Sequence, residues 1–393
     1  MAVSGGADSS ALALLARSWA ARRRGTLLAL IVDHRLRTGS DAEAALTGDR
    51  LAAIGIRSRV LPIEGLRRGP ALAARARDAR YAALTRVCAG EGILHLLLGH
   101  HAGDQAETVL LRRAGGSLSA GLAAMPAVRE TDDVRLLRPL LDVPPGRLRA
   151  TLHQAGLDWI EDPSNADPAA TRARIRASRD DPDGTGEGTA ALGAEAAARG
   201  GARASAEREA AAVLAACASF RPQGFVVVRA PSLPPDALAA ALAAVTGGRF
   251  RLSPRDLRRF APGLGAGTVG GAEIRSGGRW APDAWLLLRE AAAMAPPVPA
   301  EDGAEWDGRY RLRGSLCGGT LGALGPDARR LRDCTALPAA VLATLPAIRR
   351  GATLLAVPGV TSSPDGLEVT WCPTRPAACA PFLPLATRCS LRG

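Results

Sequence analysis

In the first 165 residues, short apolar runs alternate with longer segments that have the composition of helices. The apolar runs 27–33 and 93–99 end in polar residues, and 57–63 resembles another strand; the helix-like segments are 9–24, 41–54, 71–89 and 104–114. Strands that alternate with helices are typical of parallel βαβ units. The pattern therefore predicts an α/β domain with a doubly wound, Rossmann-like parallel sheet, and ligands at the carboxyl ends of its strands.

The chain of 393 residues is too long for one ordinary core and indicates two or three domains. We predict the α/β domain at 1–179, a flexible linker at 180–201, a central helical and mixed domain at 202–295, and a small C-terminal α+β domain at 305–393. The linker prediction rests on a segment rich in Gly, Ala, Asp and Glu. Within the central domain we predict helices at 202–218 and 235–245 and strands at 225–229 and 285–289.

The net charge of +12 comes entirely from arginine, since the chain contains no lysine. A surplus of this size is compatible with a polyanionic partner, although it can also serve solubility. The seven cysteines include no Cys-x-x-Cys pair, so we predict no structural zinc or iron–sulfur site. No apolar run approaches the ~20 residues that span a bilayer, and the start leaves no room for a signal peptide. We therefore expect a cytoplasmic location.

The segment from Ser4 to Ser9 has the sequence Ser-Gly-Gly-Ala-Asp-Ser and lies between a strand end and an apolar helix. A helix N-terminus binds phosphate through unpaired N–H groups and the positive end of the helix dipole. The glycines allow close backbone approach, and the two serines add hydroxyl donors. Asp8 would repel bare phosphate, which suggests Mg²⁺ beside it. The alternative is a glycine-rich turn with an ordinary helix cap.

Asp104 and Glu107 are three residues apart at the start of a predicted helix and share one face. They could bind the ammonium group of a substrate or remove its proton, or they could simply complement the helix dipole. Arginine at every second position, 172, 174 and 176, suits a strand edge or an irregular arm that contacts RNA phosphates. Arg77 and Arg80 could contact phosphate or form a solvated helix face.

The Ser4–Ser9 segment resembles the pyrophosphate-binding loop of the N-type ATP pyrophosphatases, the PP-loop superfamily. Six further segments resemble, in the same order, those of the tRNA(Ile)-lysidine synthetases: Val32–Arg37, Arg77–Tyr81, Gly99–Thr108, Arg112–Met125, Arg138–Leu141 and Trp159–Arg176. Trp306–Leu312 is similar to a marker in the C-terminal region of some members. Two positions depart from the family pattern: Gly103 stands where an Asp is usual, and Ala173 replaces a frequent Asn.

The resemblance implies a ligase that forms a carbon–nitrogen bond. ATP would adenylate the C2 oxygen of the wobble cytidine in a minor isoleucine tRNA with a CAU anticodon, and L-lysine would then displace AMP to give lysidine. The cofactors implied are ATP and Mg²⁺. Residues 1–179 would be the catalytic domain, and the central domain would bind the tRNA. No membrane partner is expected, and a homodimer is one possible assembly.

The resemblance also assigns roles to particular residues. Asp8, Asp104 and Glu107 would be catalytic, with Asp104 and Glu107 binding lysine and Asp8 holding Mg²⁺. ATP and pyrophosphate would contact nine residues: Ser4, Gly5, Gly6, Ala7, Asp8, Ser9, Val32, Asp33 and His34. Phosphate or tRNA would contact six arginines: Arg77, Arg80, Arg112, Arg172, Arg174 and Arg176.

Two alternatives stay open at this stage. One is another PP-loop enzyme that modifies tRNA, such as a thiolase, although thiolases that act on cytidine usually carry the Cys-x-x-Cys pairs missing here. The other is a catalytically degraded homologue that retains tRNA binding. Gly103 and the three residues that precede the loop favour this second alternative.

Overall fold

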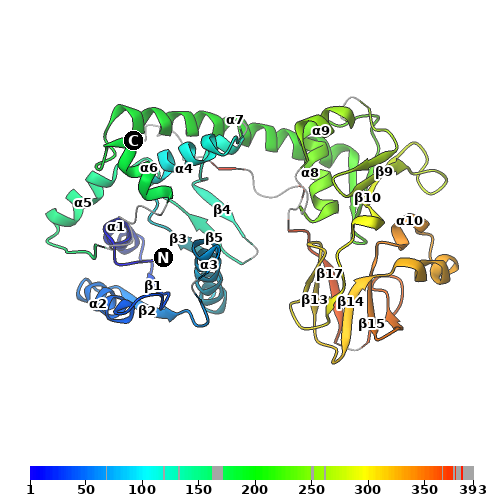
Figure 1. Ribbon diagram of the computed structural model, residues 1–393, viewed down its shortest axis with the longest axis horizontal. Helices are drawn as coiled ribbons and strands as arrows, with labels where there is room; N and C mark the ends of the chain where they lie inside the picture. The colour runs from blue at the N-terminus through cyan, green and yellow to red at the C-terminus, as the bar shows by residue number, and fades with distance from the viewer. Residues whose placement is uncertain are drawn as a thin grey trace. The chain divides into compact units, whose positions relative to one another are not determined.

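The computed structural model describes residues 1–67, 69–117, 120–131, 133–161, 171–248, 252–260, 263–364, 366–374, 377 and 382–383. The chain forms two compact units, one of Met1–Ala204 with Phe382–Gly393 and one of Ser205–Pro381 (Figure 1). Both contain helices and strands, so the protein is mixed α/β. In the part of the chain that the structure describes, no helix is long and apolar enough to cross a membrane.

The first unit contains a small parallel sheet. Strands β1 (Leu28–Asp33) and β2 (Arg57–Pro62) pair in parallel, as do β3 (His95–Leu97) and β5 (Arg135–Leu137). Residues 1–3 join these pairs, because Ala2 bridges Leu30 in parallel and its N–H donates to the carbonyl of Leu97 at 2.9 Å. Strand β4 (Val128–Glu130) adds an antiparallel edge to β5. The predicted parallel sheet is therefore present, with short strands.

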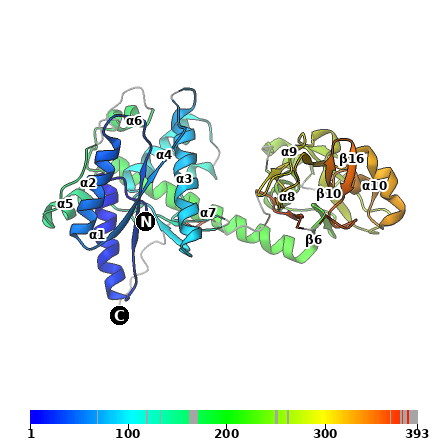
Figure 2. The same cartoon turned by 90° about the horizontal axis from the view of Figure 1, so that it is seen from below.

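Helices cover both faces of this sheet because β1 is apolar on both sides. Successive side chains of a strand point to opposite faces. Ala29 and Ile31 accordingly pack in one core and Leu30 in another. Helices α1 (Ala7–Arg22), α2 (Ser40–Ala53) and α5 (Pro145–Gln154) lie on one face, and α3 (Leu72–Gly90) and α4 (Ala102–Ala114) on the other (Figure 2). This arrangement places the start of α1 and the start of α4 at the same edge of the sheet, at the carboxyl ends of the parallel strands.

Two segments differ from the sequence-based expectation. The arginines at 172, 174 and 176 lie in a helix, α6 (Thr171–Arg179), and not on a strand edge or an irregular arm. Their spacing of two resembles a strand pattern, but Arg172 and Arg176 are also four apart and share a helix face. Helix α7 (Glu187–Cys217) begins inside the predicted flexible linker at 180–201. Its many alanines have the highest helix propensity of any residue, which outweighs the interspersed glycines.

The second unit is rich in antiparallel β-structure, where we expected smaller helical and α+β domains. Its largest sheet has the order β6-β7-β10-β9-β8, and helices α8 and α9 pack on one face of it. The bounds are β6 (Ala218–Arg221), β7 (Phe225–Val228), β8 (Gly267–Val269), β9 (Ala272–Ser276), β10 (Trp285–Arg289), α8 (Pro235–Thr246) and α9 (Pro254–Phe260). Whether residues 202–295 and 305–393 form separate domains stays a prediction.

Two smaller sheets complete this unit, in the orders β11-β14-β15-β16 and β12-β13-β17. Their strands are β11 (Val298–Pro299), β12 (Glu305–Trp306), β13 (Tyr310–Arg313), β14 (Gly319–Ala323), β15 (Pro346–Arg350), β16 (Thr353–Ala356) and β17 (Glu368–Trp371). Short helices connect the strands, namely η3 (Ala291–Ala293), η4 (Gly325–Cys334) and α10 (Ala339–Leu342), while η1 (Gly121–Ala123) belongs to the first unit.

The Trp306–Leu312 marker holds a buried ionic cluster. The side chains of Arg289, Asp307 and Arg309 are fully buried. Asp307 Oδ2 accepts from Nε of Arg289 at 3.0 Å and from Nε of Arg309 at 2.8 Å, and Oδ1 accepts from the N–H of Ala295 at 3.0 Å. Burial alone would raise the pKa of Asp307, but the hydrogen bond and charges of the two arginines outweigh it and lower the pKa. The marker therefore encodes a charged element of the core.

Candidate active site

The Ser4–Ser9 loop joins residues 1–3 to α1 and is held by hydrogen bonds of its serines. The N–H of Ser4 donates to Oγ of Ser9 at 3.1 Å, and that hydroxyl donates to the carbonyl of Gly6 at 3.0 Å. Helix α1 starts at Ala7 without a side-chain cap, so the N–H groups of its first turn have no intrahelical acceptor. Free donors at a helix N-terminus are suited to bind phosphate oxygens, as the sequence predicts.

Gly5 takes a conformation that other residues rarely adopt. Its φ is +86°, and a Cβ at this position would collide with Oγ1 of Thr47 and lie 3.1 Å from Cδ1 of Ile160. The carbonyl of Gly5 accepts from the N–H of Ile160 at 2.9 Å. The loop is therefore packed closely between α2 and the segment that follows α5, and only glycine fits at its turn.

Asp8 and Asp104 approach each other through His101. Nε2 of His101 is 3.4 Å from Oδ2 of Asp8 and 3.6 Å from Oδ2 of Asp104. His101 also caps α4, because its Nδ1 accepts from the N–H of Gly103 at 3.1 Å while its own N–H donates to Asp104 at 3.0 Å. Burial alone would lower the pKa of His101, but contact with Asp8 and the nearby carboxylates raise it. The structure thus brings two predicted catalytic carboxylates to one place.

Glu107 is buried, with 1% of its surface exposed, and pairs with Arg176. Nε of Arg176 donates to Oε1 of Glu107 at 2.8 Å. Within the described residues, Oε2 of Glu107 is buried and has no hydrogen-bond partner. Burial alone would lower the pKa of Arg176, but the bond and charge of Glu107 raise it. Arg176, predicted as a phosphate or tRNA contact, therefore lies against a predicted lysine-binding residue.

Residues at the end of β1 form the other side of the site. Asp33 is buried, and its Oδ1 accepts from the N–H of Arg35 at 2.9 Å. Burial lowers the pKa of His34, and the charge of Arg80 lowers it further. Nδ1 of His34 and Nδ1 of His100 are buried without a hydrogen-bond partner among the described residues. Buried polar atoms are normally paired, so these two nitrogens are available as hydrogen-bonding partners for a ligand.

Sequence reasoning did not select His100, although it lies in the quoted Gly99–Thr108 segment. Burial lowers the pKa of His100 to about 4, and the charges of Arg138, Arg77 and Arg80 act in the same direction. His100 is therefore neutral at pH 7. Its position directly after β3 and its place in the motif could have identified it, because ligands bind at strand ends.

The other predicted arginines either contact groups of the protein itself or lie exposed. Nη1 of Arg112 donates to the carbonyls of Gly121 at 2.6 Å and Ala124 at 2.8 Å, so this side chain holds the η1 turn. Arg77 and Arg80 lie over the ring of Tyr81, at 5.1 and 5.6 Å from its centroid. Nη2 of Arg174 donates to Thr171 at 3.3 Å, and Arg172 is exposed. The quoted Asp162–Asp167 motif lies outside the described residues.

Gly103, the main departure from the family pattern, contacts the ring of His101. A Cβ at position 103 would lie 2.9 Å from Cε1 and 3.1 Å from Nδ1 of that ring. The orientation of His101 toward Asp8 therefore depends on glycine at this position. An Asp there would require the ring to turn, and the cap of α4 would change with it.

We predict that Gly103→Ala destabilises the protein by about 1 kcal/mol, the usual cost of losing a helix cap. This predicted loss of stability is opposite in sign to the usual effect, because an alanine normally stabilises a helix interior by up to about 1 kcal/mol over glycine. The control is Gly193→Ala in α7, where a Cβ would meet nothing within 4 Å. Urea unfolding measures both variants. Equal stabilisation of the two would show that the ring of His101 does not restrict position 103.

The residues that could hold a metal ion are few. Among the described residues, no group of three or more His, Cys, Asp or Glu side chains is arranged for a metal. Asp8 offers one carboxylate at the loop, with 37% of its side chain exposed. Mg²⁺ is often bound by one or two carboxylates together with substrate phosphates. Asp8 therefore fits an ion that arrives with a nucleotide.

Comparison with known proteins adds to this geometry. A family model described as a PP-loop domain matches residues 1–178. A tRNA(Ile)-lysidine synthase of Bradyrhizobium sp. (strain BTAi1) is 45% identical over 179 residues, which are 45% of this chain and 50% of that protein. A tRNA(Ile)-lysidine synthase of Mesorhizobium japonicum is 36% identical over 350 residues, which are 84% of this chain and 76% of that protein. The chain thus matches about half the length of the first relative and three quarters of the second.

A solved structure, the U34-tRNA thiolase NcsA of Methanococcus maripaludis with its [4Fe-4S] cluster, is similar with a TM-score of 0.41 and 18% identity. The match covers 49% of this chain and 67% of the thiolase. Similarity at this level establishes neither a shared fold nor a shared activity.

Proposed function

The chain belongs to the tRNA(Ile)-lysidine synthase family, and we propose that it joins L-lysine to C2 of the wobble cytidine in a minor isoleucine tRNA. In the first step, the C2 oxygen bonds to the α-phosphorus of ATP and pyrophosphate leaves. In the second, the ε-amine of lysine attacks C2, the bond from C2 to the AMP oxygen breaks, and the amine loses a proton.

The observation that carries the proposal is the buried carboxylate of Glu107, whose Oε2 has no hydrogen-bond partner among the described residues. A buried carboxylate oxygen without a donor is costly, and a lysine ammonium would satisfy it. Asp104 lies in the first turn of the same helix, three residues earlier, so both carboxylates would face the ammonium. Arg176 would hold Glu107 in place through Oε1 and leave Oε2 for the substrate.

The loop would bind the triphosphate. The free N–H groups at the start of α1 would take the β- and γ-phosphate oxygens, with hydroxyl donors from Ser4 and Ser9. Asp8 would hold Mg²⁺, which would neutralise phosphate charge when bound. Val32, Asp33 and His34 at the end of β1 would contact the nucleoside part, and the unpaired Nδ1 of His34 would be one contact.

The arginines would bind the tRNA. Arg172 and Arg174 lie exposed on α6, next to the turn of helix that carries Arg176. Arg77 and Arg80 lie on α3 beside the nucleotide side of the site. The net charge of +12 favours an RNA partner, and residues 202–295 would add to its binding. The proposal is compatible with a homodimer.

The proposal predicts that the protein incorporates labelled lysine into an unmodified minor isoleucine tRNA transcript when ATP and Mg²⁺ are present. Incorporation should disappear when ATP is omitted or when the wobble cytidine is changed. The measurement is radiolabel retained in precipitated RNA. A transcript of the methionine tRNA, which has the same anticodon, serves as a specificity control.

Two other results would contradict the proposal in different ways. Binding of tRNA without incorporation would favour the degraded homologue, in which Gly103 has removed a required carboxylate. A product that contains sulfur in place of lysine, with a sulfur donor supplied, would favour another PP-loop enzyme.

A further inference from the structure

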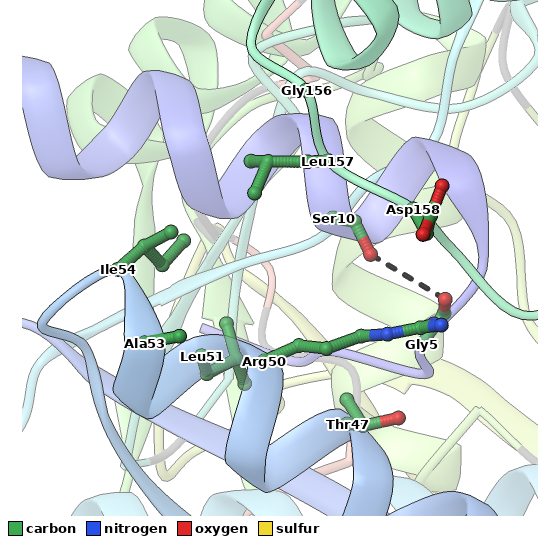
Figure 3. Close-up of a pocket in the computed structure, with 10 residues that line it drawn as sticks. All are labelled: Gly5, Ser10, Thr47, Arg50, Leu51, Ala53, Ile54, Gly156, Leu157 and Asp158. Atoms are coloured by element: carbon green, nitrogen blue, oxygen red, sulfur yellow. Dashed lines mark hydrogen bonds between the residues drawn. The ribbon is translucent and has the colours of Figure 1, made fainter.

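A cavity of about 210 Å³ lies beside the Ser4–Ser9 loop, on the face of the sheet that α1 and α2 cover (Figure 3). Its lining comes from three parts of the first unit: the loop and α1, helix α2, and the segment after α5. The lining residues are Gly5, Ser10, Thr47, Arg50, Leu51, Ala53, Ile54, Gly156, Leu157 and Asp158. At about 30 Å³ for each water molecule, the space holds roughly seven waters or one small organic molecule.

Arg50 places a buried cationic donor in this cavity. Its side chain extends from α2 toward Gly5 (Figure 3). Nη1 is buried, and among the described residues it has no hydrogen-bond partner. A buried cationic donor without an acceptor costs more free energy than a neutral one. The structure therefore offers a strong binding position for an anionic oxygen.

Polar and apolar groups lie at opposite ends of the cavity. The guanidinium of Arg50, the carboxylate of Asp158 and the hydroxyl of Ser10 lie toward the Gly5 end (Figure 3). That hydroxyl donates to the carbonyl of Gly5 at 3.4 Å. The other end is lined by aliphatic side chains, those of Leu51, Ile54 and Leu157.

A simple anion does not match this division. Arg50 would attract it, but the carboxylate of Asp158 at the same end would repel it, and the aliphatic end would stay empty. A ligand that carries a carboxylate, a neighbouring ammonium and a short alkyl chain would satisfy all three parts. Its carboxylate would bind Arg50, its ammonium would face Asp158, and its alkyl chain would pack on the aliphatic wall.

We propose that this cavity is a binding site for a free α-amino acid with an aliphatic side chain. It is separate from the proposed lysine position, because Asp104 and Glu107 belong to α4 on the opposite face of the sheet. Gly5 contributes to both the cavity and the phosphate-binding loop, so an occupant would touch the loop from its outer side.

The test is calorimetric titration of the full chain with L-norleucine, without ATP or RNA. Norleucine has the required head and alkyl chain but no ε-amine, so it cannot serve as a substrate. We expect binding that weakens about ten- to a hundredfold in Arg50→Gln, the usual effect of losing a charged hydrogen bond. Hexanoate, which lacks the ammonium, and inorganic phosphate should bind more weakly than norleucine.

Three variants complete the design. Arg57→Gln, an exposed arginine on β2, should bind norleucine as the unaltered protein does. Ala53→Leu would narrow the aliphatic end without changing the charged end, and it should also weaken binding. If Arg50→Gln lowers the melting temperature of the protein, Ala53→Leu still tests the site, because it leaves Arg50 in place. Glu107→Gln should leave norleucine binding unchanged.

Each contrary result overturns the proposal. Loss of norleucine binding in Glu107→Gln with retention in Arg50→Gln would place the amino acid in the catalytic site. Phosphate or hexanoate binding as tight as norleucine would identify an anion site. Absence of norleucine binding by the unaltered protein would exclude the amino-acid class. All three results are independent of whether the protein incorporates lysine into tRNA.

Discussion

Replacement of Glu107 by Gln is expected to reduce lysine incorporation by about 10²- to 10⁴-fold, the range for loss of a positioned acid–base group. Gln keeps the size of the side chain and an oxygen for Nε of Arg176. It removes the negative charge that would bind the lysine ammonium and accept its proton. The fold should persist, because the side chain of Arg176 is 44% exposed and its charge stays solvated when Glu107 loses its own.

The two steps of the reaction separate the roles of Glu107. If it serves only lysine, pyrophosphate release from ATP and tRNA should continue in the variant, while transfer of labelled lysine is lost. The matched control is Glu91→Gln, which alters a carboxylate that is also paired with an arginine, Arg59, at the protein surface. Incorporation within tenfold of the unaltered protein would exclude Glu107 from lysine handling. Loss of both steps would assign it to the nucleotide.

Replacement of Asp307 by Asn is expected to destabilise the second unit by about 3–5 kcal/mol, the cost of removing one partner from a buried ion pair. The side chains of Asp307, Arg289 and Arg309 are all fully buried. Asn has nearly the same shape but no charge, so two buried guanidinium groups would lose this carboxylate. Desolvated charges depend on such partners far more than exposed ones do.

Urea unfolding followed by tryptophan fluorescence measures this effect, since Trp306 is buried beside the cluster. Asp333→Asn, at an exposed position, should change stability by less than about 0.5 kcal/mol. The folded-state pKa of Asp307 lies below its ordinary value of 3.8, so its contribution is complete above pH 3.8 and is lost as the pH falls further. The difference between the two proteins should therefore stay constant from pH 7 to 5. A loss below about 1 kcal/mol would show that the cluster is not a main source of stability.

The sequence predicted the elements of the first unit closely. Helices expected at 9–24 and 41–54 are Ala7–Arg22 and Ser40–Ala53, and the strand expected at 27–33 is Leu28–Asp33. These elements have strong local signals, because apolar runs, polar ends and glycine turns follow one another at short distances. The position of the loop at a helix N-terminus follows from the same signals.

Contacts between distant segments could not be predicted in this way. The pairing of Glu107 with Arg176 joins residues far apart in the chain and depends on how α6 packs against α4. The unpaired Nη1 of Arg50 likewise depends on the packing of three segments around one cavity. Alternate arginines have the period of two that is typical of a strand, although residues 171–179 form a helix. Composition could have corrected this, since arginine and alanine both favour helices.

The position of residues 1–3 bears on how the chain folds during synthesis. These residues are synthesised before β1 and β3, yet they lie between the two strands, and Ala2 contacts both Leu30 and Leu97. Leu97, the second partner of Ala2, is synthesised only after α1, β1, α2, β2 and α3. Pairings between distant residues form slowly, because the intervening chain must be ordered first. The Ser4–Ser9 loop, which follows these residues, should therefore reach its folded conformation only once the chain has been translated well past β3.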